Sequence, residues 1–135
     1  MARKSKKHAR RRARESALAL IYSSDIMELD AMSIVEEGAY PAGDINLSEY
    51  AESLVKGVSE HRAEIDEYLV SSSENWTLDR MPVVDRAILR VAIYEMLFVD
   101  EVPVSVAINE AVELAKRFGQ DKSPEFINGV LAKFA

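Results

Sequence analysis

The chain has 135 residues and a formal net charge of −6, and it contains no cysteine. A chain of this length fits one domain that buries roughly two-thirds of its unfolded surface, and the lack of cysteine excludes disulfides and thiolate metal sites. No apolar run approaches the ~18 residues of a membrane span, and no signal-like hydrophobic region follows the basic start. We therefore expect a cytoplasmic protein, with an organellar transit peptide as the alternative interpretation of the arginine-rich start.

The net charge conceals a strongly basic start. Residues 3–14 carry eight basic side chains and no acidic one, so the rest of the chain holds nine basic residues against 23 acidic ones. A basic arm on an acidic body indicates binding of nucleic acid or another anionic partner. The alternative is a solvated tail that only aids solubility. We expect residues 1–8 to form a flexible arm.

The first helix is predicted over residues 9–27. Its apolar stripe consists of Ala13, Ala17, Leu20 and Ile21. Another side of the same helix, at spacings of three and four, carries Arg11, Arg14, Leu18 and Tyr22. Guanidinium groups beside an aromatic ring suit an unpaired RNA strand, because the cations bind phosphates and the ring stacks on a base. The alternative places Tyr22 half-buried in the core.

The middle of the chain carries no recognisable chemistry. A short helix is predicted over residues 32–38, and the Pro and Gly of residues 40–44 predict a loop. Asn46 begins a capping box with Glu49, and apolar spacing then predicts one long helix to about Ser71. The serines that follow predict a hinge, so we place the two helical halves at residues 9–73 and 74–135.

A helix that is apolar nearly all round is predicted over Val83–Val99, which makes it the central core helix. Its charged residues are Asp85, Arg86, Arg90 and Glu95. The first three fall within a narrow arc, so one charged strip remains on a buried rod. This strip is the place where a partner would contact the helix.

Two more helices complete the pattern. The first runs from about Pro103 to Phe118, with Phe118 in its core stripe and Gly119 as its stop. The second begins with Ser123 as a cap, and its Phe126 lies off the centre of the core stripe, where it either packs at the core edge or stacks on a base. Gly129 lies inside this helix, where glycine lowers helix stability by roughly 1 kcal/mol relative to alanine. Its presence indicates either a close helix contact or a backbone that another group must approach.

Several motifs in order carry a resemblance to a known family. They are Ala9–Glu15 with Tyr22, Asn75–Arg80, Pro82–Arg90 with Tyr94–Glu95, Val102–Pro103, Ile108–Lys116, and Ser123–Pro124 with Phe126–Leu131. With these motifs the chain resembles the NusB family of bacterial transcription antitermination factors. The resemblance covers the first thirty residues and everything after about residue 48.

The resemblance implies an all-α fold of about seven helices in two small subdomains packed across each other. It implies binding of the boxA element in ribosomal RNA operon transcripts, together with the small-subunit ribosomal protein NusE, as part of the RNA polymerase antitermination complex. It also implies no catalytic activity, no cofactor and no metal. Some family members self-associate, so a homodimer stays open.

Matching positions imply site residues. The arginine-rich motif and its extension give the expected RNA contacts as Arg10, Arg11, Arg14, Tyr22, Arg90, Lys122 and Phe126. The expected contacts to NusE are Asp85 and Arg86. The basic residues 3–7 and Lys122 depart from the family pattern, so their effect on RNA affinity stays open.

Two other classes of function remain as alternatives. Some ribosomal RNA methyltransferases carry a NusB-like domain, and this chain resembles such a domain standing alone; it has no glycine-rich phosphate loop and no nucleophile with a placed base. The other alternative is a protein adaptor whose basic arm binds an acidic partner.

Overall fold

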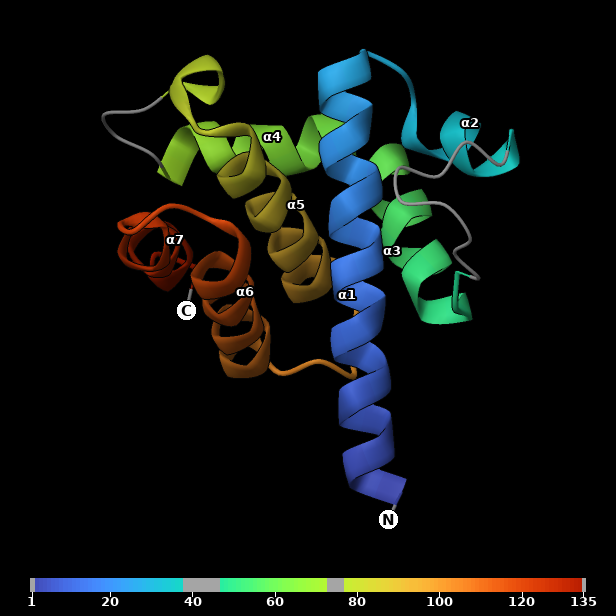
Figure 1. Cartoon of the computed structure of the whole chain (residues 1–135). Helices are drawn as coiled ribbons and strands as arrows, with labels where there is room; N and C mark the ends of the chain where they lie inside the picture. Colours follow the sequence, from blue (N-terminus) through green and yellow to red (C-terminus); the bar gives the residue numbers. More distant parts are fainter. Residues whose placement is uncertain (1, 38–46, 73–76, 135) are drawn as a thin grey trace. The chain divides into compact units, whose positions relative to one another are not determined.

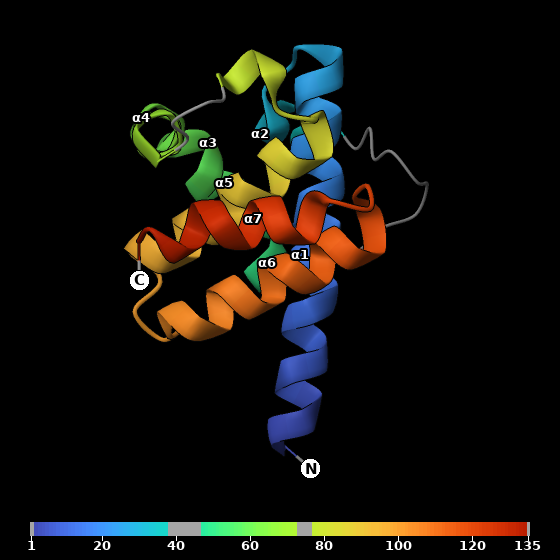
Figure 2. The same cartoon turned by 90° about the vertical axis from the view of Figure 1, so that its left-hand side faces the viewer.

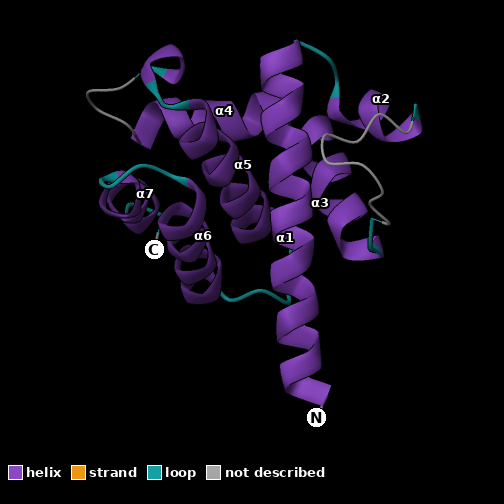
Figure 3. Cartoon of the chain, viewed as in Figure 1, coloured by secondary structure: helices purple, strands orange, loops and turns teal. Residues whose placement is uncertain are grey.

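The computed structural model describes residues 2–37, 47–72 and 77–134, and every regular element in these ranges is a helix (Figure 1, Figure 3). This confirms the all-α prediction. The chain divides into two compact units, Met1–Glu60 and His61–Ala135. The expected boundary at residue 73 lies outside the described residues, and the observed division falls one helix earlier.

The first unit consists of α1 (Ala2–Met27), α2 (Ala31–Glu36) and α3 (Glu49–Glu60), and each of these helices contacts the other two. The predicted apolar stripe of α1 is buried. The helix begins at Ala2 and not at Ala9, so the basic run is helical where we expected a flexible arm. Lysine and arginine are good helix formers, which explains why the helix extends through this run.

The junction from α1 to α2 is held by main-chain and side-chain hydrogen bonds. Leu29 N donates to Ser24 O at 3.2 Å, and Glu28 takes a positive φ of 56°, which together form a Schellman-type helix end. The next residue, Asp30, caps α2 and accepts a hydrogen bond of 2.5 Å from Ser59 Oγ of α3. The ends of α2 and α3 are therefore joined.

The long helix predicted from its Asn46 cap to about Ser71 is instead two helices, α3 and α4 (Arg62–Ser72), with a break at His61. Helical spacing of apolar residues continues from Val58 to Ile65, so the pattern could not reveal the break. Each half packs on a different helix, α3 on α1 and α4 on α5 (Val83–Phe98). The cap of α3 is Ser48, whose Oγ accepts from Ala51 N at 3.1 Å; Asn46 lies outside the described residues.

The second unit is built around α5, which packs against α4, α6 (Val104–Phe118) and α7 (Ser123–Ala132). A single 3-10 turn, η1 (Leu78–Arg80), precedes α5. Seven successive residues of α5, from Ala87 to Ile93, are buried, so the prediction of a central core helix is confirmed. Helices α6 and α7 lie side by side and contact one another (Figure 2).

The two glycines of this region differ in their surroundings. A Cβ added to Gly119 would lie 2.6 Å from Ser123 Cβ, so the close approach of Ser123 requires glycine there. Ser123 Oγ accepts from Gln120 N at 2.9 Å and does not cap α7, which begins at Ser123 itself. A Cβ at Gly129 would meet no described atom within 4 Å, so of the two alternatives for Gly129 the described residues do not support a close helix contact.

Candidate nucleic-acid interface

The first turns of α1 carry a concentration of positive charge. Lys6, Lys7 and Arg12 are exposed, and Arg10 and Arg11 are partly exposed. We call these five residues the cationic end of α1. The beginning of α1 extends past α3 (Figure 1). All five side chains belong to this helix and not to an irregular tail. Such an arrangement attracts a phosphate backbone, because each neutralised phosphate releases a counterion.

An aromatic ring of α3 contacts this cationic end. The guanidinium carbon of Arg10 lies 4.6 Å from the centroid of the Tyr50 ring, within the range of a cation–π interaction. Tyr50 stands in the first turn of α3 and is partly exposed. Sequence reasoning missed this residue, because residue spacing within one helix does not indicate which residue of another helix contacts it.

The predicted RNA face of α1 is interrupted by buried residues after Arg11. Arg14 and Leu18 are 3% and 5% exposed, whereas Tyr22 is 41% exposed. The structure therefore leaves Arg10 and Arg11 partly exposed at the cationic end of α1 and Tyr22 at a separate exposed position. The rise of an α-helix places Tyr22 about 15 Å along α1 from Arg12.

In the second unit, the start of α7 presents two of the expected RNA contacts. Lys122 is exposed immediately before the helix, and Phe126 is partly exposed one turn later. Close by in sequence, at the end of α6, Phe118 is 46% exposed, so its predicted place in the core is wrong. The guanidinium of Arg117 lies 5.3 Å from the Phe118 ring centroid, which adds a second exposed cation–aromatic pair that sequence reasoning missed.

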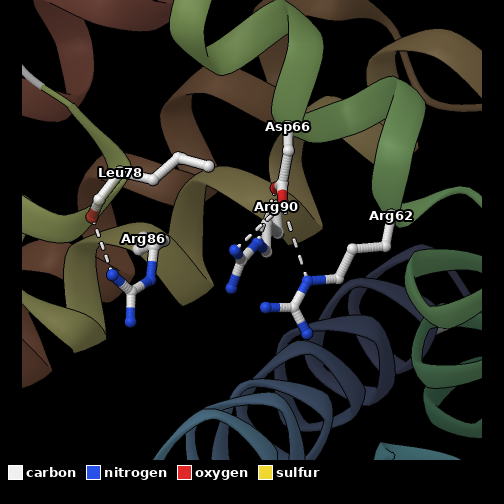
Figure 4. Close-up of polar contacts among 5 residues, drawn as sticks. All are labelled: Arg62, Asp66, Leu78, Arg86 and Arg90. Carbon is white, nitrogen blue, oxygen red and sulfur yellow. Dashed lines mark hydrogen bonds and ion pairs between the residues drawn. The ribbon is translucent and has the colours of Figure 1, made fainter.

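Arg90, another expected RNA contact, lies in the interior of the second unit. Its side chain is 3% exposed and its Nε lies 2.9 Å from Asp66 Oδ1 of α4 (Figure 4). Arg62 approaches the same carboxylate from the surface, at 3.6 Å. This geometry gives Arg90 a role in joining α5 to α4.

The charged strip expected on α5 is also largely internal. Asp85 is 2% exposed, and its Oδ1 has no hydrogen-bond partner within the described part of the chain. Burial raises the pKa of the Asp85 carboxyl above its usual 3.8, and a hydrogen bond with Ser123 opposes that rise. Arg86 donates from a guanidinium nitrogen to Leu78 O at 2.7 Å, which fastens η1 to α5 (Figure 4).

Other kinds of site find no support in the described ranges. Within residues 2–37, 47–72 and 77–134, no three His, Asp or Glu side chains are grouped so that they could hold a metal ion. Over the same ranges, no helix is both long and apolar enough to cross a membrane.

Comparison with protein families decides the relationship. The model of the NusB family matches residues 11–135. The chain belongs to the NusB family. The transcription antitermination protein NusB of Kineococcus radiotolerans is 45% identical over 127 residues, which cover 94% of this chain and 93% of that protein. The protein of the same name in Bacillus subtilis strain 168 is 44% identical over 123 residues, with coverage of 91% and 92%.

Solved NusB structures have the same fold. T. maritima NusB superposes with a TM-score of 0.81 and 36% identity, covering 93% of this chain and 89% of that chain. A chain from the crystal structure of antitermination factors NusB and NusE in complex with dsRNA gives a TM-score of 0.75 and 27% identity, with coverage of 92% and 93%. The family and the fold predicted from the sequence are therefore confirmed.

The family match begins inside the cationic end of α1. Its first matched residue is Arg11, so Lys6, Lys7 and Arg10 precede the part of the chain that the NusB model matches. These three side chains nonetheless continue the same helix as Arg11 and Arg12.

Proposed function

We propose that this chain acts as a transcription antitermination factor that binds boxA-type RNA of ribosomal RNA operon transcripts together with the ribosomal protein NusE. The cationic end of α1 carries the proposal, because it concentrates positive charge on an acidic chain. The similarity to a NusB chain solved with NusE and dsRNA supports both partners. Such a role acts on nascent transcripts in the bacterial cytoplasm and requires no covalent chemistry, cofactor or metal.

Each unit carries its own proposed RNA contacts. In the first unit, Arg10 and Arg11 bind phosphates and Tyr22 stacks on an unpaired base. In the second unit, Lys122 supplies a cation and Phe126 a ring edge. Exposure supports these five assignments. The burial of Arg14 and Arg90 favours an indirect role for both, in which they hold the helices that present the surface.

The proposed contact with NusE lies at the start of α5. The acidic character of the chain beyond residue 14 suits a basic ribosomal protein. Asp85 is 2% exposed, so it would support this contact from inside the second unit, at the start of α5. Arg86 would hold this end of α5 through its bond to Leu78 O.

The deciding experiment measures binding of a short labelled boxA-like RNA over a salt series, with and without purified NusE. A scrambled RNA and a double-stranded version serve as controls. We expect selective binding that NusE strengthens, and a log–log salt slope of about −4 if six phosphates of a single strand are neutralised. Equal weak binding to all RNAs that is indifferent to NusE would contradict the proposal and favour a protein adaptor.

Two variants separate the proposed surfaces. Tyr22→Ala should weaken RNA binding by about 1–3 kcal/mol if the ring stacks on a base. Asp85→Lys should lose NusE binding while RNA binding is kept; because Asp85 is buried, Asp85→Asn is the milder companion variant. The reverse pattern, with RNA binding lost through Asp85→Lys in a folded protein, would show that the two surfaces are exchanged.

A further inference from the structure

Tyr50 and Arg10 form a contact that joins two helices at the cationic end of α1. The ring belongs to α3 and the guanidinium to α1, and the 4.6 Å between the guanidinium carbon and the ring centroid is a face contact. A cation over the face of a ring is attracted by the negative potential of that face. The ring of α3 therefore helps to fix the position of the Arg10 guanidinium on α1.

The first turn of α3 fixes the position of the ring. Ser48 caps the helix through its bond to Ala51 N, and Tyr50 O accepts from Ser53 Oγ at 2.7 Å. The next residue in the chain, Ala51, is fully buried, as is Leu54 one turn further on. A tyrosine has only two side-chain torsions, so an anchored backbone leaves the ring little freedom.

We propose that Tyr50 is a positioning residue for RNA binding, which holds the Arg10 guanidinium in the orientation in which it meets a phosphate. The inference rests on the RNA-binding role proposed above and deepens it. A free arginine side chain loses considerable rotamer freedom when it binds a phosphate, and an arginine that a ring already orients loses less. The predicted gain is affinity without an additional contact between protein and RNA.

The test is a double-mutant cycle on RNA affinity with Arg10→Ala and Tyr50→Leu in the full chain. Tyr50→Leu should weaken binding about fivefold in the parent. In the Arg10→Ala background it should have no further effect, because the residue that it positions is gone. Tyr50→Phe keeps the aromatic face and should bind within about twofold of the parent.

A matched control is available in the second unit. Tyr68 is 42% exposed and contacts the Phe134 ring, far in sequence from the cationic end of α1. Tyr68→Leu makes the same chemical change and should leave RNA affinity unaltered. Side-chain NMR resonances of Arg10 provide an independent measurement, because the ring shifts them in the parent and in Tyr50→Phe but not in Tyr50→Leu.

The outcomes distinguish this inference from the proposed function. If the parent does not bind RNA, the proposed function fails. If the parent binds RNA but Tyr50→Leu binds equally well, Tyr50 positions nothing. If Tyr50→Leu weakens binding equally with and without Arg10, the ring contacts RNA by itself, and the positioning role is overturned. Unshifted Arg10 resonances in the folded parent would overturn it as well.

Discussion

Arg90 and Asp66 form a two-pronged ion pair that joins α5 to α4. Arg90 Nε lies 2.9 Å from Asp66 Oδ1, and a terminal nitrogen of the same guanidinium lies 3.2 Å from Oδ2 (Figure 4). The arginine is 3% exposed and the aspartate 21% exposed. Parallel hydrogen bonds of this kind fix the relative orientation of the two groups. Lysine is a poor replacement for arginine in such a pair, because it lacks the planar fork of donors. The pair therefore holds the α4–α5 contact in place.

Removing one member of this pair should destabilise the second unit strongly. We expect Asp66→Ala to lower the free energy of unfolding by about 3 kcal/mol, because it removes the carboxylate that accepts two hydrogen bonds from the buried Arg90 guanidinium. Urea unfolding measured by circular dichroism provides the check. Arg62→Ala removes only the exposed partner at 3.6 Å and should cost less than about 1 kcal/mol. Equal losses of unfolding free energy in Asp66→Ala and Arg62→Ala would show that the burial of Arg90 does not determine how much the ion pair stabilises the protein.

The buried carboxyl of Asp85 should make stability depend on pH. Its pKa is raised by burial, so between the ordinary value of 3.8 and the raised folded value the folded state holds the proton more tightly than the unfolded state. The contribution of Asp85 to stability is consequently largest at low pH and is lost as the pH rises through the folded pKa.

Asp85→Asn removes this titration while nearly keeping the shape of the side chain. We expect the variant to gain stability relative to the parent at pH 7 and the difference to shrink toward pH 4. Urea unfolding of both proteins at several pH values provides the measurement. A difference between the two proteins that stays constant with pH would mean that the carboxyl titrates alike in the folded and unfolded states.

Replacement of glycine by alanine should have opposite effects on stability at two positions of the second unit. Gly119→Ala places a Cβ 2.6 Å from Ser123 Cβ and 2.8 Å from Ala115 O, and overpacking of this kind costs about 1–3 kcal/mol. Gly129→Ala places a Cβ in open space within a helix and should stabilise the protein by about 0.5–1 kcal/mol. Thermal unfolding of the two variants checks both signs. Destabilisation by Gly129→Ala would reveal a contact that the helix geometry does not show.

Helical spacing predicted which residues share a side of a helix, and it did so correctly for the buried stripe of α1 and for the core helix α5. It could not predict what covers each side. Spacing places Arg14 and Arg90 on charged sides of their helices, yet each is almost fully buried. The break at His61 was missed for a related reason. The apolar spacing stays in phase through residues 58–65, and only packing on different helices shows that α3 and α4 separate there.

Two arginines of α1 differ in burial, and we therefore expect opposite effects of their removal on stability and on RNA binding. Arg12 is exposed at the cationic end, whereas Arg14 is 3% exposed. Arg12→Ala should leave the free energy of unfolding within about 0.5 kcal/mol of the parent. It should weaken binding to every RNA alike and reduce the magnitude of the salt slope by about 0.7, because one phosphate contact of a single strand is lost.

Arg14→Ala should show the reverse. Truncating a buried arginine removes packing of its methylene groups together with its charge, so we expect a stability loss of about 2 kcal/mol. The salt slope of the folded variant should match that of the parent, because a buried guanidinium neutralises no phosphate. Unfolding curves and RNA titrations of both variants under identical salt conditions separate the two roles. A reduced salt slope in Arg14→Ala, without loss of stability, would return Arg14 to the RNA surface and show that α1 turns this side chain outward when RNA binds.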